Sequence, residues 1–339
     1  MFQTNLHVWL QSWDNEWTLR FFRVITSLGY TEFFIVSLIV IIFGIHFRKG
    51  FVLLLIVMWT TLVTEVLKET FTLPRPFMVE KEVKLLDDKI ETDVKLLDNA
   101  GATHFFDVLP SSTVQYFKDK DIRPGLPSGH TSIAVAFWGS IILLFRRRWL
   151  TILCSILLFL IPFSRMYLGV HFLADILSGY IVGGVMLLCF YRVVIHPKAL
   201  SRYLKTDKYA LKIDMVNCMV LIAPFLWLLI IKDADFWIVP AVLIGFGFGF
   251  LLLSQKSLPN ETGTILNRTK KSVSALILFV GLMTLFEKLF SVIGFDNKAF
   301  ADFVNYLLVC FITIWFGTKL HLRLGWSSPE RHKEPATDS

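Results

Sequence analysis

Long apolar runs separated by short charged segments dominate the pattern of this 339-residue chain. A run of about 17 to 25 helical residues can cross the roughly 30 Å hydrocarbon core of a bilayer. Nine stretches qualify, the fourth of them short: 30–46, 51–70, 129–145, 149–163, 171–192, 212–231, 236–254, 273–294 and 302–319. The pattern predicts an all-α, polytopic membrane helix bundle with about nine transmembrane helices.

The first 29 residues follow a different pattern. Their apolar residues recur at helical spacing, with the charged residues mostly off that stripe: Leu6, Trp9, Leu10, Trp13, Trp17, Phe21, Val24 and Ile25. Such a stripe is typical of an amphipathic helix, and Trp favours the boundary between membrane and water. We therefore expect residues 1–29 to form an interfacial helix on the outer surface.

The loop charges favour one orientation. Cytoplasmic loops hold an excess of Lys and Arg. One alternate set of loops carries most of these residues, including Arg146, Arg147 and Arg148. This places the amino terminus and the 77–125 segment outside the cytoplasm. A bacterial inner membrane, with the outer loops in the periplasm, is the expected location, and the endoplasmic reticulum with a luminal site is the alternative.

Composition narrows the class of protein further. Hydrophobic residues make up 55% of the chain and charged residues only 18%, too few to solvate an ordinary globule of this size. The net charge of +7 would suit nucleic acid only if the basic residues formed one patch. Because they are spread over several loops, no nucleic-acid partner is expected, and the bilayer is the expected surrounding.

Three polar clusters lie at the predicted outer ends of spans, where charged residues are costly and point to function. In the first, Lys68 and Arg75 lie at the outer end of the second span, seven residues apart. Pro74 and Pro76 must break the helix, so Arg75 can fold back beside Lys68. Two converging cations suit a phosphate, although basic residues that only anchor a helix end are the alternative. Glu65 is expected to pair with Lys68.

The second cluster is Gly-Leu-Pro-Ser-Gly-His, at the start of the third span. Ser128 is a plausible N-cap, and Gly129 lets an anion approach the backbone N–H groups and the positive end of the helix dipole. His130 then sits beside the anion. An ordinary helix start with a satisfied histidine is the alternative.

The third cluster, Arg165, His171 and Asp175, leads into the fifth span. His171 and Asp175 at i and i+4 would share one helical face. The carboxylate can then hold one ring nitrogen and leave the other free as a nucleophile. Arg165 can add a bidentate grip on phosphate oxygens. A structural His–Asp pair is the alternative.

All three clusters fall on the same predicted face of the membrane. Here the sequence resembles the type 2 phosphatidic acid phosphatase superfamily, whose three-part signature KxxxxxxRP, PSGH and SRxxxxxHxxxD is matched at every fixed position. The resemblance covers about residues 30–190. The nine-span layout is similar to the glucose-6-phosphatase and sphingosine-phosphate phosphatase branches.

The resemblance implies a role for each matched residue. His171 would attack phosphorus and form a phosphohistidine while Asp175 holds its ring, and His130 would protonate the leaving oxygen and then activate water. The phosphate oxygens would be held by a larger set: Lys68, Arg75, Ser128, Gly129 and Arg165. Neither a metal ion nor another cofactor is expected, because these cations supply the charge and no metal-ligand spacing lies near the site.

The expected function is an integral membrane phosphatase that hydrolyses a lipid phosphate monoester or diphosphate. A lipid phosphotransferase, a phosphatase of a soluble sugar phosphate and a non-enzymatic anion or lipid transporter are the alternatives. The expected division of the chain has four parts: an interfacial helix at 1–29, a catalytic membrane core at 30–195 with its extracytoplasmic loop at 77–125, a further four-helix membrane region at 196–320, and a disordered cytoplasmic tail at 321–339.

Overall fold

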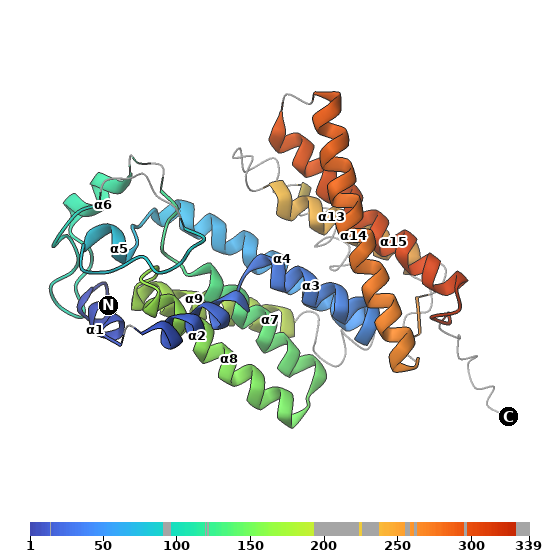
Figure 1. Ribbon diagram of the computed structural model, residues 1–339, viewed down its shortest axis with the longest axis horizontal. Coiled ribbons are helices and arrows are strands. Elements are labelled where there is room, and N and C mark those ends of the chain that lie inside the picture. Colours follow the sequence, from blue (N-terminus) through green and yellow to red (C-terminus); the bar gives the residue numbers. More distant parts are fainter. Residues whose placement is uncertain are drawn as a thin grey trace. The chain divides into compact units, whose positions relative to one another are not determined.

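The computed structural model describes residues 1–13, 15–90, 96–118, 120, 122–192, 224–225, 237–254, 258–260, 263–294 and 297–329. Within these ranges the chain is helical and contains no strand, apart from one isolated bridge between Pro259 and Pro329 (Figure 1). The predicted all-α class is confirmed.

The chain divides into two compact units. The first unit comprises Met1–Phe34 and Trp59–Arg192, and the second comprises Ile35–Met58 and Val193–Ser339. The divisions fall inside helices α3 (Thr31–Val40) and α4 (Phe47–Phe71). All eight residues of the three-part signature site lie in the first unit.

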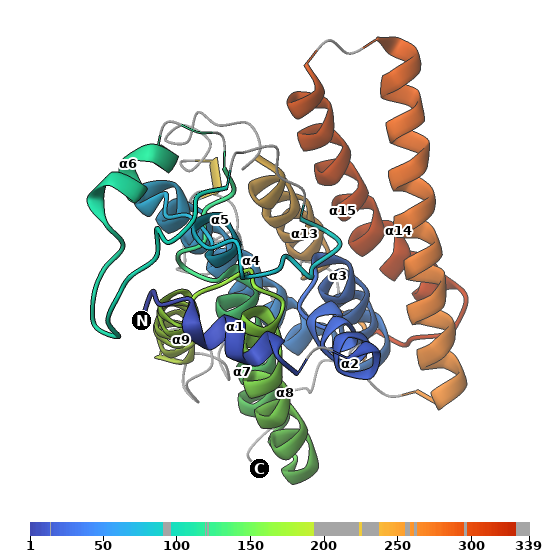
Figure 2. The same cartoon turned by 60° about the vertical axis from the view of Figure 1, so that its left-hand side comes forward.

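The first unit contains the start of α3, the end of α4 and seven further helices: α1 (Asn5–Gln11), α2 (Glu16–Ser27), α5 (Pro76–Val79), α6 (Ser111–Lys118), α7 (Gly129–Phe145), α8 (Arg148–Tyr167) and α9 (Leu173–Phe190). Helix α7 packs against both α8 and α9, and α2 lies along α8 (Figure 2). Glycines bring α7 and α9 close together, since a Cβ on Gly179 would lie 2.7 Å from Thr131 Cβ and one on Gly183 2.7 Å from Val135 Cβ.

The predicted spans of this unit are present with shifted ends. The span predicted at 129–145 coincides with α7, whereas α8 continues past the predicted end at residue 163 to Tyr167. Arg165 therefore lies in the last turn of a helix and not in a loop that leads into the fifth span. Helix α9 begins at Leu173, so His171 lies between two helices.

The amino-terminal segment forms two helices where the sequence predicted one. Helix α1 ends at Gln11, and Asn15 starts α2 by accepting a hydrogen bond on its side chain from the Thr18 N–H, at 2.9 Å. The apolar stripe is divided between solvent-exposed and buried positions. The exposed members are Leu6, Trp9, Trp13, Trp17, Phe21 and Val24, while Leu10 and Ile25 are buried. The interfacial position remains a prediction.

The segment between α4 and α7 packs against the chain next to His171. Helices α5 and α6 share a buried cluster with the residue that follows His171: Phe77, Met78, Val79, Val83, Leu109, Phe117 and Phe172. This segment thus packs its apolar residues against the chain beside the predicted nucleophile.

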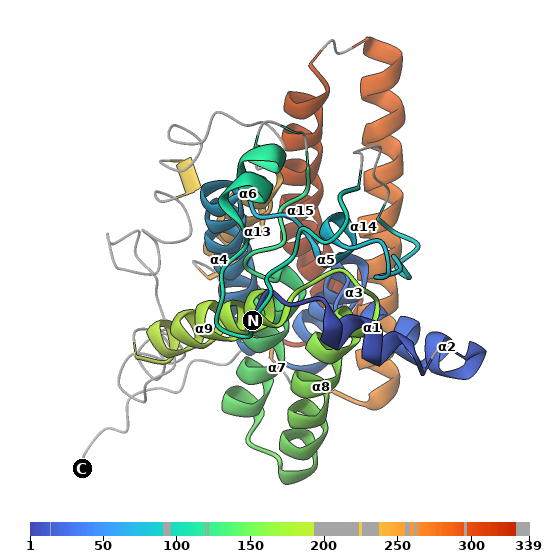
Figure 3. The same cartoon turned by 90° about the vertical axis from the view of Figure 1, so that its left-hand side faces the viewer.

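The second unit contains the end of α3, the π-helical turn η1 (Ile41–Ile45), the start of α4, and α13 (Ile238–Ser254), α14 (Ile265–Ile293) and α15 (Lys298–Arg323). Helix α15 packs against α13 and runs beside α14 (Figure 3). Gly245 and Gly249 permit the α13 contact, because a Cβ on either would overlap the backbone carbonyl of Leu307 or the side chain of Ile314.

Three of the four spans predicted between 196 and 320 are these helices, with α14 starting eight residues before the predicted 273. The span predicted at 212–231 lies outside the described residues except for 224–225. The tail predicted to be disordered from 321 instead completes α15 at Arg323, and Ser328 accepts a hydrogen bond from the Asn260 N–H, at 2.7 Å. Residues 330–339 lie outside the description.

Several described helices meet the length and hydropathy of membrane spans: Phe47–Val79, Arg148–Tyr167, Leu173–Phe190, Ile265–Ile293 and Lys298–Arg323. The bent pair Glu16–Ser27 and Thr31–Ile45 would add one more, and α7 and α13 are shorter apolar helices. Only 6% of the most apolar window of α14 is buried within the protein. An apolar surface of that extent fits contact with lipid. The count of nine spans stays a prediction.

Candidate active site

Arg75 lies in the break between helices α4 and α5, and its side chain is buried. Helix α4 ends at Phe71, and Thr72 follows in the left-handed region at φ 46°. The Arg75 guanidinium, 6% exposed, donates to the carbonyl oxygens of Arg123 at 2.9 Å and Val170 at 3.2 Å. The helix breaks before Arg75, as the flanking prolines predicted, and the Arg75 side chain contacts the chain just before the second signature segment and, at Val170, inside the third.

Lys68 lies against the start of α7. Its Nζ forms the predicted ion pair with Glu65, at 2.7 Å. A Cβ on Gly129 would lie only 3.3 Å from this Nζ, so the ammonium group rests beside the Gly129 backbone. The first and second clusters therefore meet, with a cation at the positive end of helix α7.

Backbone hydrogen bonds join the second cluster to the other two. The Gly125 N–H donates to the Leu73 carbonyl at 2.8 Å, and the Ser128 N–H donates to the Asp175 carbonyl at 2.9 Å. Ser128 occupies the N-cap position of α7, as predicted, but its side chain makes no capping bond. Its hydroxyl instead accepts from the Thr131 hydroxyl at 3.0 Å. Ser128 is thus the N-cap residue without a capping bond from its side chain.

A Schellman motif at the end of α8 positions His171. The Gly169 N–H donates to the Met166 carbonyl at 3.0 Å and the Val170 N–H to the Arg165 carbonyl at 3.1 Å, with Gly169 at φ 76°. This pattern of two bonds and a left-handed glycine is a common way for a helix to end. It holds the residue before His171 against the backbone of Arg165. Gly169 at the fourth position after Arg165 was the sequence signal for this turn.

The His171–Asp175 pair forms in a different way from the one predicted. His171 precedes the N-cap residue Phe172, so the two side chains do not share one helical face. Asp175 Oδ2 instead turns back over the start of α9, where it accepts from the Phe172 N–H at 2.9 Å and lies 3.3 Å from His171 Nδ1. Both side chains are at most 2% exposed. The contact through Nδ1 leaves Nε2 of His171 for chemistry.

The environment of His171 favours the neutral imidazole. Burial lowers the pKa of His171 well below its usual value, and the positive charges of Arg75, Arg165, His130 and Lys68 lower it further. A neutral ring carries the lone pair that a nucleophile needs. These charges also reveal that residues from all three clusters act on one imidazole.

His130 presents an unsatisfied nitrogen. Its ring packs edge-on against Tyr30, with centroids 5.1 Å apart. Its Nε2 is buried and has no hydrogen-bond partner among the described residues. A buried polar atom left in this way is costly unless a ligand supplies the partner. His130 is therefore available to a bound oxygen atom.

Arg165 binds an acidic residue that the sequence patterns did not single out. Its Nη1 donates to Asp87 Oδ2 at 2.6 Å and to the Thr26 hydroxyl at 2.8 Å. Asp87 also accepts from the Tyr30 hydroxyl at 2.7 Å. The Arg165 Nε is buried without a partner among the described residues, so it remains available as a donor. Asp87 belongs to a segment rich in acidic residues, and its sequence carries no spacing signal.

The Asp87 carboxylate is ionised despite its burial. Burial works against the charged form, but Arg165 and the hydrogen bonds from Tyr30 and the Lys89 N–H outweigh it, so the pKa of Asp87 lies below the ordinary aspartate value. The ion pair with Arg165 is almost fully buried, each side chain being 2% exposed. It fastens the segment between α5 and α6 to the end of α8.

Helix α1 supplies two more contacts that the sequence reasoning missed. His7 Nε2 lies 2.9 Å from the carbonyl oxygen of His171. Gln11 donates to the carbonyls of Tyr167 at 2.9 Å and Lys84 at 2.8 Å. Both residues are buried although they lie on a helix predicted to rest on the surface. Polar residues on the inner side of an amphipathic helix were the available signal.

Together these features define the class of protein to which this chain belongs. The chain is an integral membrane protein, an all-α polytopic bundle with a buried His–Asp pair surrounded by Lys68, Arg75 and Arg165. Within the part of the chain that the structure describes, no group of three or more His, Cys, Asp and Glu side chains has a metal-binding arrangement.

Comparison with known proteins identifies the region that carries this site. Residues 49–197 match the model of the PAP2 superfamily, and all eight predicted site residues lie within that match. Over 60 residues the chain is 38% identical to the lipid A 4'-phosphatase of Bacteroides thetaiotaomicron. That alignment covers 18% of this chain and 27% of the relative, so the chain spans about a quarter of that protein's length. No solved structure matches the chain at a comparable level.

Proposed function

We propose that this protein is a membrane phosphatase that hydrolyses a lipid phosphate monoester or diphosphate through a phosphohistidine, without a metal ion. The observation that carries the proposal is the buried His171–Asp175 contact, with Nδ1 engaged and three cations nearby. The PAP2 match and the name of the lipid A 4'-phosphatase support a lipid phosphate as substrate.

In the first step, His171 Nε2 attacks phosphorus in line with the leaving oxygen. A P–N bond forms and the P–O bond breaks, while His130 gives its proton to the leaving oxygen. The Nδ1–H of His171 donates to Asp175, which stabilises the positive charge that develops on the ring. An arriving phosphate carries the negative charge that favours a protonated His130 among these cations.

In the second step, water attacks the phosphohistidine. His130 takes a proton from the water, the P–N bond breaks, and phosphate leaves while His171 returns to its neutral form. Lys68, Arg75, the Gly129 backbone and the remaining donor of Arg165 hold the oxygens as charge moves among them. Ser128 would donate its hydroxyl, which in the described structure accepts from Thr131.

The test is phosphate release by the full-length protein in mixed micelles with EDTA and no acceptor alcohol. The panel contains phosphatidate, phosphatidylglycerol phosphate, a polyprenyl diphosphate, a sphingoid phosphate, lipid A and glucose 6-phosphate. We expect release from at least one lipid and none from glucose 6-phosphate. Release only when an acceptor lipid is added would indicate a phosphotransferase. Release from the sugar phosphate alone, or only with added metal, would overturn the proposal.

A further inference from the structure

The proposed acid–base histidine, His130, is not held in place through its Nε2. This atom has no hydrogen-bond partner among the described residues, whereas Nδ1 of His171 contacts Asp175. A general acid must present its proton at a fixed position and angle, because a displacement of about 1 Å can lower a rate about a hundredfold. The side chains that pack against the His130 ring therefore matter for its role.

The turn between α2 and α3 forms one wall around the His130 ring. Gly29 and Tyr30 lie between α2, which ends at Ser27, and α3, which begins at Thr31. A Cβ on Gly29 would lie 2.9 Å from His130 Cδ2, so a side chain at this position would displace the ring. The Tyr30 ring packs edge-on against His130, with centroids 5.1 Å apart and planes at 81°. Together, Gly29 and Tyr30 restrict the rotation of the imidazole.

The Tyr30 ring is itself fixed by several contacts. Its hydroxyl donates to Asp87 Oδ1 at 2.7 Å, and Asp87 Oδ2 accepts from Arg165 Nη1 at 2.6 Å. Lys89 Nζ lies 4.2 Å from the centroid of the ring, and Arg165 Cζ lies 6.0 Å from it. Cations at such distances are attracted to the face of an aromatic ring. Tyr30 thus connects His130 to the buried ion pair of Asp87 and Arg165.

Tyr30 belongs to none of the three signature segments, and it precedes the region 49–197 that matches the PAP2 superfamily. Its hydroxyl proton is donated to the Asp87 carboxylate, so this proton is not available to a leaving oxygen. The edge-on contact instead lets Tyr30 act through the neighbouring imidazole. The geometry therefore suits a residue that orients a reacting group and does not itself react.

On the basis of the proposed function, we propose that Tyr30 is a positioning residue, which holds the His130 imidazole in the orientation from which it protonates the leaving oxygen. The aromatic ring restrains His130, and the hydroxyl bound to Asp87 keeps that ring in place beside Arg165. Without the ring of Tyr30 the imidazole can rotate, and its proton is then aimed at the leaving oxygen for less of the time. The P–O bond breaks more slowly wherever the leaving oxygen needs that proton.

The test compares two leaving groups in the full-length protein, in mixed micelles with EDTA. Dodecyl phosphate has an alkoxide leaving group that needs a proton, whereas 4-dodecyl-2-nitrophenyl phosphate has a phenolate that leaves without one. The value of kcat/KM is measured for both esters, since it reports the first transition state relative to free enzyme and substrate. Loss of positioning lowers kcat/KM for the dodecyl ester selectively, whereas a general structural defect lowers it for both.

Relative to the parent protein, Tyr30→Leu should lower kcat/KM about 10- to 100-fold for the dodecyl ester and less than about threefold for the nitrophenyl ester. His130→Ala should show the same selectivity and a larger loss, because it removes the acid itself. Tyr30→Phe keeps the ring against His130 and should retain most of the activity that Tyr30→Leu loses.

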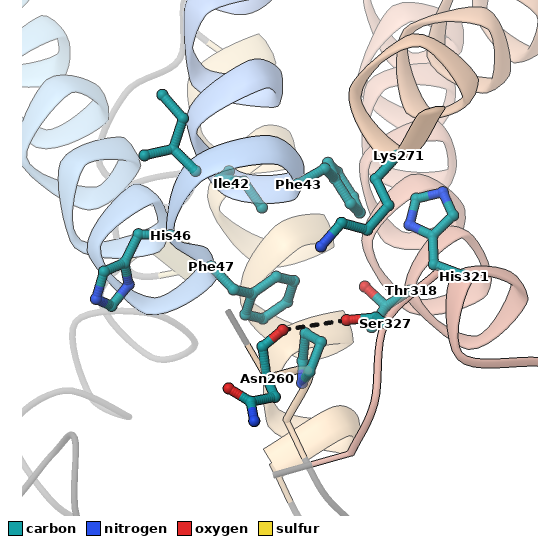
Figure 4. Close-up of a pocket in the computed structure, with 11 residues that line it drawn as sticks. Ile42, Phe43, His46, Phe47, Asn260, Lys271, Thr318, His321 and Ser327 are labelled. Atoms are coloured by element: carbon teal, nitrogen blue, oxygen red, sulfur yellow. Dashed lines mark hydrogen bonds between the residues drawn. The ribbon is translucent and has the colours of Figure 1, made fainter. Parts of the chain in front are cut away.

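Two further variants keep the result interpretable. Gly29→Ala places a methyl group against His130 Cδ2 and should give the same selective loss, even if Tyr30→Leu fails to fold. Phe43→Leu is the matched control, because Phe43 packs edge-on against His321 in the second unit, with centroids 5.5 Å apart (Figure 4). It removes an equivalent contact between an aromatic ring and a histidine, and it should leave kcat/KM for both esters unchanged.

Three results would overturn the role of Tyr30: equal losses for the two esters in Tyr30→Leu and Gly29→Ala, parental kcat/KM for the dodecyl ester in both variants, or a loss in Tyr30→Phe as large as in Tyr30→Leu. A selective loss in Phe43→Leu would also contradict it. Failure of the proposed function looks different. The parent protein would then release phosphate from neither ester, or His130→Ala would lose equally with both, and the role of Tyr30 would fall with that function.

Discussion

At the scale of single residues, the two histidines of the site occupy different surroundings. His171 is engaged at Nδ1 by Asp175, whereas His130 Nε2 has no partner among the described residues. This asymmetry suits a nucleophile and an acid–base group, respectively. Neither histidine belongs to the apolar clusters around Tyr167 and Phe117.

We predict that His171→Ala reduces phosphate release to the background rate and that His130→Ala reduces it by about 10²- to 10⁴-fold. Each variant should elute and unfold like the parent protein, because the changes remove reacting groups and little packing. His104→Ala, an exposed histidine of the α5–α6 segment, is the matched control and should retain activity. Phosphate release by His171→Ala at the parental rate would rule out the proposed nucleophile.

Asp87 and Asp88 are adjacent carboxylates, and we expect their replacement by alanine to affect stability very differently. Asp87→Ala leaves buried Arg165 without its counter-charge and should lower the free energy of unfolding by about 3 to 5 kcal/mol. Asp88→Ala breaks only an exposed pair with Arg23 and should change it by about 0 to 1 kcal/mol. Thermal unfolding in detergent measures both. Similar losses in the two variants would contradict a structural role for the buried pair.

The lowered pKa of Asp87 also predicts how stability changes with pH. A carboxyl group whose pKa is lower in the folded state stabilises the protein fully above its unfolded pKa of about 3.9. This contribution is lost as the pH falls through the lower folded value. The difference in melting temperature between the parent and Asp87→Ala should therefore be constant near neutral pH and shrink below about pH 4. A difference that is independent of pH down to acid unfolding would contradict this assignment.

At the scale of elements, the end of α8, the link that follows it and the start of α9 form one continuous, hydrogen-bonded segment. The Schellman motif at Gly169 ends α8, and Asp175 caps α9 three residues after the N-cap Phe172. The short link between them contains His171, so both helix ends restrain the proposed nucleophile. Arg165, His171 and Asp175 are thus placed by two helix ends and not by a shared helical face.

We predict that Gly169→Ala disrupts the Schellman motif and the link that follows it. Its φ of 76° costs a residue with a Cβ about 1 to 2 kcal/mol, and the new methyl would overlap the Lys84 carbonyl. Phosphate release should fall further than this cost in stability alone would explain, because the link contains His171. Gly184→Ala on α9 is the control, since no atom lies within 4 Å of its added Cβ, and it should be neutral or stabilising. Thermal unfolding and phosphate release distinguish the two, and parental activity in Gly169→Ala would argue against the restraint.

At the scale of the whole molecule, the orientation in the membrane can be tested directly. In a cysteine-free background, Phe106→Cys at an exposed position of the α5–α6 segment should react with an impermeant maleimide in intact cells. Arg147→Cys, in the exposed turn between α7 and α8, should react only after permeabilisation. Both variants should be assayed in the orientation-neutral detergent state as a labelling control. The reverse pattern would place the site on the cytoplasmic face.

Much of this protein was readable from its sequence, because membrane spans and signature residues are local signals. Apolar length predicted α7 at its observed bounds, and the prolines predicted the break in the helix before Arg75. The Lys68–Glu65 pair followed from helical spacing alone. These features depend on residues close together in the chain, where spacing determines geometry.

Contacts between segments that are distant in the sequence could not be predicted and are visible only in the folded structure. Asp87 is one acidic residue among many until the segment after α5 folds and brings it to Arg165, 78 positions away. His7 meets the His171 carbonyl across 164 positions. Hydropathy and local spacing carry no information about such pairings, because burial of polar groups depends on which partners the tertiary fold supplies.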